Sequence, residues 1–228
     1  MLAADLARLR AGAADIGCPL SDEQADCLMA YLALLAKWNR VYNLTAVREP
    51  AEMLTQHLLD SLSIVPPLRR HTGGQAARLL DVGSGGGLPG VVLAVAMPEL
   101  DVTCVDTVAK KTSFIRQVAL ELKLPNLHAA HSRVETLDAG AFDVVVSRAF
   151  ASLADFIRLT RRHIETTGVW LAMKGRHPSD EIDDLPAGVT VFHVEQLSVP
   201  GLVAERCALW LRPTDSSRNA LPAMAAAR

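Results

Sequence analysis

Residues 78–90 read RLLDVGSGGGLPG, an apolar strand that runs into an acid and then a cluster of glycines. Glycines allow positive φ angles and let a ligand lie directly against the main chain, so this stretch is typical of a loop that binds a nucleotide cofactor. Pro89 suits the first turn of a helix that follows the loop. A strand, a glycine loop and a helix in this order predict an α/β fold, and the identity of the nucleotide decides the function.

Two overlapping motifs in this loop predict different cofactors. Gly85, Gly87 and Gly90 satisfy G-x-G-x-x-G, the dinucleotide fingerprint, in which a pyrophosphate lies at a helix N-terminus. Gly83, Gly85 and Gly87, preceded by Asp81, satisfy the acid-x-G-x-G-x-G pattern of S-adenosylmethionine-dependent methyltransferases. A carboxylate at the strand end repels a pyrophosphate but attracts the cationic methionine half of S-adenosylmethionine. Asp81 therefore favours the methyl donor.

A second acid supports a nucleoside ligand without choosing between the two cofactors. Residues 100–105 alternate as a strand that ends at Asp106, roughly twenty residues after the glycines, where a carboxylate can accept both ribose hydroxyls. Asp106 also stands beside Thr107 where it can cap the next helix, and the two roles are compatible.

The rest of the chain predicts a doubly wound, Rossmann-like sheet of seven strands, mostly parallel, with an antiparallel closing strand. Apolar strand patterns alternate with helical ones at 79–82, 102–105, 127–130, 142–147, 169–173, 189–196 and 204–211. We expect an N-terminal helical extension over 1–72, a catalytic domain over 73–213 and a disordered tail over 214–228. Within the extension, Ser21 and Gln24 form a capping box, and Glu49-Pro50 opens a helix that stops before Pro66-Pro67.

Composition indicates a cytoplasmic enzyme with neither a membrane segment nor a metal site. The chain has 228 residues, half of them hydrophobic, and a net charge of -2. Its four cysteines are scattered, and we interpret Cys104 as a buried packing residue. Basic residues outnumber acids fourteen to ten between positions 69 and 176, where Lys110 and Lys111 are the best candidates for phosphate contacts.

Several further motifs occur together with the glycine loop. They are Asn43-Leu44-Thr45-Ala46-Val47, His57-Leu58-Leu59-Asp60-Ser61, Ser132-Arg133-Val134-Glu135, Ser147-Arg148-Ala149-Phe150-Ala151 and Lys174-Gly175. With Gly87-Leu88-Pro89-Gly90, they make the chain from about Tyr31 to Leu211 resemble the bacterial small-subunit (16S) ribosomal RNA guanine-N7 methyltransferases, historically called glucose-inhibited division protein B. The chain departs from the family pattern at Ser84 and Gly86, where threonine and proline are common.

The resemblance implies a class I methyltransferase fold, S-adenosylmethionine as cofactor and the small ribosomal subunit as partner. We also expect the enzyme to be a monomer. It implies that Gly83 and Leu88 border the cofactor, that Val134 and Glu135 flank the adenine, and that Arg148 lines the site as a positioning residue. The full cofactor set that we expect is Asp81, Gly83, Gly85, Gly87, Leu88, Asp106, Val134, Glu135 and Arg148. The expected RNA contacts are Lys110, Lys111, Arg133, Phe150 and Lys174.

The implied reaction requires no general base, because guanine N7 has an in-plane lone pair and no proton. Catalysis then depends on positioning the reacting atoms. For Arg148 the alternative is a structural salt bridge to Glu135 or Asp143, and for Phe150 it is packing against the next helix. Methylation of a small molecule or protein, and an NAD-dependent oxidoreductase, are the alternative functions.

Overall fold

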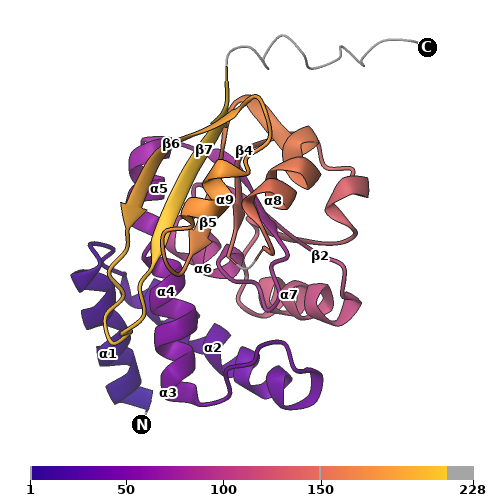
Figure 1. Cartoon of the computed structure of the whole chain (residues 1–228). Coiled ribbons are helices and arrows are strands. Elements are labelled where there is room, and N and C mark those ends of the chain that lie inside the picture. The colour runs from indigo at the N-terminus through magenta and orange to yellow at the C-terminus, as the bar shows by residue number, and fades with distance from the viewer. Residues whose placement is uncertain (1, 149, 215–228) are drawn as a thin grey trace.

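The computed structural model describes residues 2–148 and 150–214. Its strands are β1 (Ala77–Val82), β2 (Leu100–Asp106), β3 (Leu127–His131), β4 (Phe142–Ser147), β5 (Ile164–Lys174), β6 (Val189–Gln196) and β7 (Cys207–Pro213). They form one sheet of order β3-β2-β1-β4-β5-β7-β6 (Figure 1). Strands β1 to β5 pair in parallel, and β7 is antiparallel to both of its neighbours. The predicted mostly parallel sheet with an antiparallel closing strand is confirmed.

Two strands begin three or more residues away from their predicted starts, for identifiable reasons. Strand β5 begins at Ile164, earlier than predicted, because the polar, exposed residues 165–167 separate the buried Ile164 from the apolar run that the prediction used. Strand β7 begins at Cys207, later than predicted, because pairing with β5 starts opposite Lys174. Residues 204–206 consequently belong to the loop before β7.

The helices are α1 (Leu2–Asp15), α2 (Asp22–Tyr42), α3 (Pro50–Met53), α4 (Asp60–Leu62), α5 (Val65–Thr72), α6 (Gly90–Ala96), α7 (Ala109–Glu121), α8 (Leu153–Thr160) and α9 (Ser179–Asp183). The predicted capping box of α2 is confirmed, since the Gln24 amide donates to Ser21 Oγ at 3.2 Å and the Ser21 amide donates to Gln24 Oε1 at 3.0 Å. The tail from residue 215 onward, predicted to be disordered, lies outside the described residues.

The helix predicted from Glu49-Pro50 contains a π-helical segment, η1 (Leu54–Leu59), between α3 and α4. It ends before Pro66-Pro67 as predicted, but these prolines also lie in the first turn of α5, which the sequence analysis did not anticipate. Proline is tolerated there because the first amides of a helix have no intrahelical acceptor. A π-helical turn widens the backbone and is frequent at functional sites.

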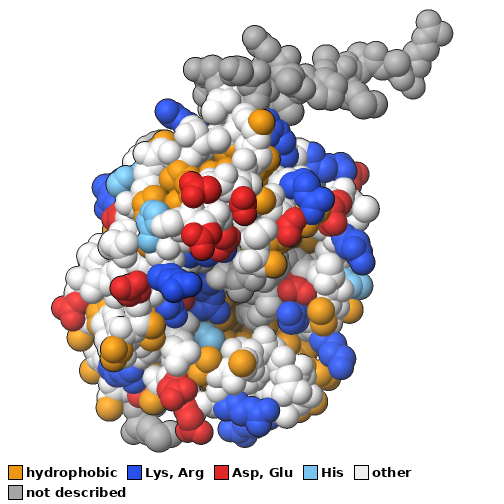
Figure 2. All heavy atoms as spheres, viewed as in Figure 1, with side chains coloured by type: hydrophobic (Ala, Val, Ile, Leu, Met, Phe, Trp, Pro, Cys, Tyr) orange, Lys and Arg blue, Asp and Glu red, His pale blue; other side chains and the backbone are white. Residues whose placement is uncertain are grey.

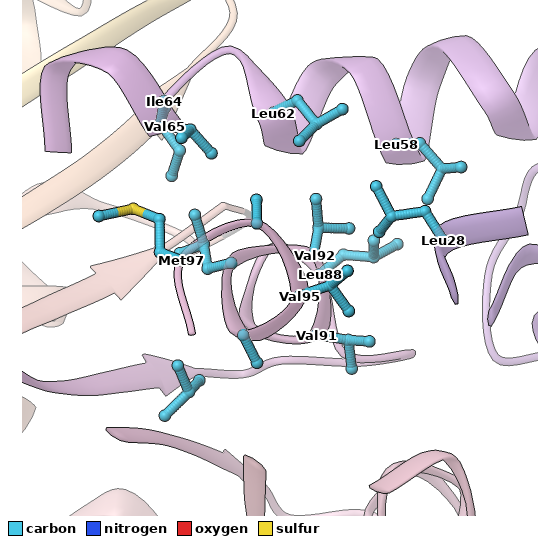
Figure 3. Packing of buried hydrophobic residues seen from close by; sticks show 14 of the residues in the cluster. Leu28, Leu58, Leu62, Ile64, Val65, Leu88, Val91, Val92, Val95 and Met97 are labelled. Carbon is cyan, nitrogen blue, oxygen red and sulfur yellow. The ribbon is translucent and has the colours of Figure 1, made fainter. Parts of the chain in front are cut away.

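Helices cover both faces of the sheet. One face packs against α1, α2, α4, α5, α6 and α7, and the other packs against α8 and α9. Helix α6 is buried throughout, and Figure 3 shows Val92 on the side of α6 that faces Leu58 and Leu62 from the N-terminal helices. The N-terminal helices are thereby part of the same core as the sheet. In the described part of the chain, no helix is long and apolar enough to cross a membrane.

Candidate active site

The glycine loop joins β1 to α6 at the carboxyl edge of the sheet. Gly83 has a φ of +69°, a backbone conformation that residues other than glycine rarely adopt. Its amide donates a hydrogen bond to the Val105 carbonyl of β2 at 2.9 Å. The Tyr31 hydroxyl from α2 donates to the Gly86 carbonyl at 2.7 Å in a fully buried setting. A Cβ on Gly86 would meet Leu35 at 2.9 Å, so α2 packs directly against the loop at the position where proline is common in the family.

Asp81 lies beneath this loop and is fully buried. Its Oδ2 accepts a hydrogen bond from the Gly90 amide at 2.8 Å, at the start of α6. Its Oδ1 is buried without a hydrogen-bond partner among the described residues. Burial raises the pKa of Asp81 to about 7, although the Gly90 amide and Arg148 act in the opposite direction. The carboxyl group is consequently poised between its neutral and charged forms near neutral pH.

Asp106, at the end of β2, connects the glycine loop to the start of α7. Its Oδ2 accepts from the Gly85 amide at 3.0 Å and lies 3.5 Å from Lys111 Nζ, while its Oδ1 accepts from the Val108 amide at 2.8 Å. The Asp106 carboxylate therefore holds both the glycine loop and the segment that leads into α7.

A cavity of about 370 Å³, the glycine-loop cavity, opens beside Asp106 at the carboxyl ends of β1 to β4. It is lined by Val82, Gly83, Val105, Asp106, Thr107, Val108, Lys111, Ser132, Arg133, Val134, Glu135, Phe150 and Leu159. Ligands of open α/β sheets bind at this edge. Its combination of apolar walls with the carboxylates of Asp106 and Glu135 suits a nucleoside.

Four of the nine predicted cofactor residues line the glycine-loop cavity, whereas Arg148 lines a second cavity, and Asp81, Gly85 and Gly87 lie in β1 and the glycine loop without lining either one. Gly83, Asp106, Val134 and Glu135 line the glycine-loop cavity. Leu88 is buried in the core beside α6 and lines neither of the two cavities described here.

The predicted RNA contacts divide among three places. Lys111, Arg133 and Phe150 line the glycine-loop cavity, and the Phe150 ring also packs on Phe156 with centroids 5.5 Å apart. The Lys110 ammonium lies over the Tyr42 ring, 5.4 Å from its centroid, at the end of α2. Lys174 lines a second cavity and pairs with Glu181 at 2.8 Å.

This second cavity, the arginine cavity, has a volume of about 380 Å³ and lies between η1, α4 and the carboxyl ends of β4 and β5. It is lined by Thr45, Val47, Gln56, His57, Asp60, Arg148, Met173, Lys174, Gly175 and Arg206. Arg148 donates to the Gln56 carbonyl at 2.8 Å and to Asp60 Oδ2 at 3.2 Å. Its salt bridge is thus with Asp60, and not with the two acids considered from the sequence.

His57 and Asp60 acquire defined positions that the sequence pattern did not provide. The His57 Nε2 lies 2.9 Å from Thr45 Oγ1, and its Nδ1 is buried without a partner in the described part of the chain. Burial, followed by the nearby Arg148, lowers the pKa of His57 to about 4, so the imidazole is neutral at physiological pH.

Arg206, Thr45 and Gln56 were not selected from the sequence as site residues. Arg206 lies in the short loop before β7, far along the chain from its partner Asp60, and no local motif marks it. Only the folded chain brings it to the arginine cavity.

The described residues offer positioning groups and no metal cluster. No group of three or more His, Cys, Asp or Glu side chains is placed to hold a metal ion in the described ranges. Cys104 is buried, and burial raises its pKa well above the ordinary range, so its thiol is not a nucleophile. The site can therefore bind and orient ligands through a nucleoside cavity and a neighbouring basic cavity.

Comparison with known proteins identifies close relatives. Residues 24–209 match the family model described as rRNA small subunit methyltransferase G. Curated proteins called Ribosomal RNA small subunit methyltransferase G from Leptothrix cholodnii and Acidovorax sp. strain JS42 are 63% and 66% identical to the chain, and each match covers 90% of this chain and 94% of the relative.

A solved structure shows the same fold at low sequence identity. A mutant of MtNAS in complex with S-adenosylmethionine is 14% identical, has a TM-score of 0.55, and is matched over 84% of this chain and 76% of its own. This likeness supports the doubly wound methyltransferase fold described above.

Proposed function

Because the chain belongs to the rRNA small subunit methyltransferase G family, we propose that it transfers a methyl group from S-adenosylmethionine to N7 of a guanosine in the 16S rRNA of the small ribosomal subunit. The observation that best supports this proposal is the glycine-loop cavity, where Asp106 lies beside the backbone of the loop. The residues of the cavity fit the nucleoside half of the methyl donor.

Each part of the cavity has a role in binding the donor. The Asp106 carboxylate is placed to accept hydrogen bonds from the ribose hydroxyls, and Val134 and Phe150 provide apolar surface for the adenine. Glu135 and the backbone of Gly83 complete the predicted contacts. When bound, S-adenosylmethionine supplies an electrophilic methyl group on a positively charged sulfur. The buried Asp81 carboxyl group lies behind the loop and stabilises that charge when it is ionised.

In the proposed reaction, the main task of the protein is to orient guanine N7 and the methyl group of the donor. Guanine N7 carries no proton, so the new nitrogen–carbon bond forms as the carbon–sulfur bond breaks and no base has to remove a proton. Holding reactants in line contributes on the order of 7–11 kcal/mol to lowering a barrier. Arg148, fixed by Asp60 and the Gln56 carbonyl, is placed to hold the acceptor as a positioning residue.

The organisation of the enzyme follows from the same proposal. We assign residues 73–213 to the catalytic domain and residues 1–72 to a helical extension that holds the glycine loop through Tyr31. We expect the enzyme to work as a monomer in the cytoplasm, where the small subunit is assembled.

The decisive experiment maps 7-methylguanosine by mass spectrometry in 16S rRNA from cells with and without the gene. We expect one modified guanosine to lose its methyl group in the deletion strain and to regain it when the wild-type chain is restored. In vitro, the purified protein should label small subunits from the deletion strain with a radioactive methyl group. An unchanged rRNA methylation map would contradict the proposal, as would binding of NAD in place of S-adenosylmethionine in calorimetry.

A further inference from the structure

One buried carboxylate, Asp60, is shared by two arginines in the arginine cavity. Its Oδ2 accepts from Arg148 Nη1 at 3.2 Å, and its Oδ1 accepts from Arg206 Nε at 2.8 Å. Asp60 is only 2% exposed, whereas the side chains of Arg148 and Arg206 are 23% and 25% exposed. The carboxylate is thus enclosed, and the guanidinium groups remain partly accessible.

The charges of this cavity do not cancel. Three cations, Arg148, Arg206 and Lys174, line it, and Asp60 is the acid among its lining residues. Lys174 is neutralised by Glu181, so two guanidinium groups share one carboxylate. A surplus of one positive charge remains beside a cavity wide enough for a polar ligand.

Polar groups that have no protein partner are also available to a ligand. Among the described residues, Arg206 Nη2 and Arg148 Nη2 make no hydrogen bond, although both side chains line the cavity. His57 is 3% exposed, and its Nδ1 has no partner in the described ranges. A buried polar atom without a partner destabilises the fold, and a ligand that pairs with it removes that penalty. Figure 2 shows Lys and Arg side chains on both sides of a hollow near the middle of this face.

An anion is the ligand that matches these groups. Guanidinium groups present paired N–H donors that fit the oxygens of a phosphate, and arginine is the usual residue for such recognition. The donor's methionine carboxylate is a second possible anion. However, the arginine cavity and the glycine-loop cavity have no lining residue in common, which favours an anion belonging to the other substrate.

We propose that the arginine cavity binds a backbone phosphate of the RNA next to the target guanosine, with Arg148 and Arg206 as the donors. This inference rests on the function proposed above. Asp60 is a positioning residue in this arrangement, because it holds two like-charged groups close together that would otherwise repel each other. The phosphate then fixes the RNA strand relative to the methyl donor.

The test compares Arg206→Gln with a matched control, Arg212→Gln. Arg212 lies six positions later, on β7, where its guanidinium packs over the exposed Phe192 ring and does not line the cavity. With small subunits from the deletion strain, we expect Arg206→Gln to raise the KM for RNA about tenfold. We also expect it to reduce the slope of log KM against log salt by about 1, as for loss of one phosphate contact. Arg212→Gln should leave both unchanged.

Two further variants separate the phosphate contact from a structural role. Arg206→Lys keeps the charge but loses the paired donors, so its KM should lie between wild type and Arg206→Gln. Asp60→Asn removes the carboxylate charge that the two arginines share, and we expect it to raise the KM for RNA. The thermal unfolding temperature of this variant is measured in parallel, to show whether it folds. If Asp60→Asn does not fold, the Arg206 variants still decide the question.

Each outcome points to one conclusion. A raised KM for RNA with the calorimetric Kd for S-adenosylmethionine unchanged within twofold supports the phosphate site. A weakened S-adenosylmethionine Kd with an unchanged KM for RNA would identify the anion as the methionine carboxylate and overturn the inference. A wild-type protein that methylates no RNA contradicts the proposed function itself, and that result is distinguishable from both.

Discussion

The two cavities of this site are assembled in different ways. In the glycine-loop cavity, Asp106 and its partner Gly85 are 21 positions apart, and the strands and loops that meet there follow one another along the chain. In the arginine cavity, Asp60 bonds Arg148 from 88 positions away and Arg206 from 146 positions away. The first cavity depends on a local motif, whereas the second depends on the complete fold. Changes near the glycine loop should therefore affect binding of the donor more than the RNA contact proposed for the arginine cavity.

The largest expected effect concerns the buried charge of Asp81. The folded pKa of about 7 lies above the ordinary value of 3.8, so ionised Asp81 destabilises the folded state increasingly as pH rises from about 4 to 7. Asp81→Asn removes this charge and keeps an acceptor for the Gly90 amide. At pH 8 we expect the variant to be more stable in urea unfolding, by at most about 4 kcal/mol, since one pKa unit corresponds to 1.36 kcal/mol.

The advantage of Asp81→Asn should shrink toward zero as the pH falls to about 4. Asp138→Asn, at an exposed carboxylate, serves as the control and should show no such trend. Binding should change in the opposite sense, because a sulfonium ion favours ionised Asp81. The affinity of the wild-type protein for S-adenosylmethionine should thus increase as pH rises through about 7. At pH 8, Asp81→Asn should bind S-adenosylmethionine more weakly than the wild-type protein does. If Asp81→Asn were less stable than the wild-type protein and bound S-adenosylmethionine equally well, both roles assigned to the Asp81 charge would be wrong.

The next effect in size distinguishes the two cavities directly. Asp106→Asn removes the carboxylate beside the glycine-loop cavity, and we expect the calorimetric Kd for S-adenosylmethionine to rise about 100-fold, since hydrogen bonds to charged groups contribute roughly 1.5–3 kcal/mol each. The KM for RNA at saturating donor should stay constant. Asp101→Asn, an exposed acid at the other end of β2, is the matched control. Equal losses for donor and RNA would mean that the two cavities are not separable.

A moderate effect is expected from crowding the start of α6. A Cβ on Gly90 would meet Asp81 Oδ2 at 2.8 Å and would also touch Cys104 Sγ. Gly90→Ala should lower the free energy of unfolding by about 1–3 kcal/mol, as for overpacking of a core. Gly175→Ala is the control, because its Cβ would have no neighbour closer than 3.9 Å. Urea unfolding of both variants measures the difference, and equal stabilities would contradict this account.

The smallest effect tests whether the N-terminal helices support the donor cavity. Tyr31→Phe removes the buried hydrogen bond to the Gly86 carbonyl, which should cost about 1–2 kcal/mol of stability and weaken S-adenosylmethionine binding a few-fold. Tyr42→Phe serves as control, since the exposed Tyr42 hydroxyl makes no hydrogen bond within the described residues. Identical donor affinities for the two variants would show that α2 does not hold the loop in place.

The difference between the glycine-loop cavity and the arginine cavity also explains how much of the site could be predicted from the sequence. The glycine loop and Asp106 were predictable because both follow directly after apolar strands in the sequence. Glycines and an acid at the ends of neighbouring parallel strands are typical of a nucleotide site. Strand β4 was predicted with its observed bounds because Phe142 and the three valines at 144–146 give a clear apolar pattern in which Asp143 is the one exposed residue. The predicted contact of Leu88 with the cofactor remains a prediction, and its side chain lies in the core.

The arginine cavity could not be predicted to the same degree. Asp60 and His57 were noticed only through resemblance, because a lone acid or histidine on an apolar helix has no periodic signal. Helical periodicity does not distinguish the π-helical segment η1 from an ordinary helix. Arg206 follows Glu205 in a loop without any motif, so its partnership with Asp60 appears only when β7 is inserted between β5 and β6.

The insertion of β7 has a consequence for how the enzyme matures. Strand β7 is the last in sequence but lies inside the sheet, and the loop before it supplies Arg206 to a carboxylate on α4. During synthesis, the glycine loop and Asp106 leave the ribosome well before Arg206 does. A chain that ends before Arg206 therefore lacks the second guanidinium group of the arginine cavity. The proposed phosphate contact of the arginine cavity can thus form only after translation has passed Arg206.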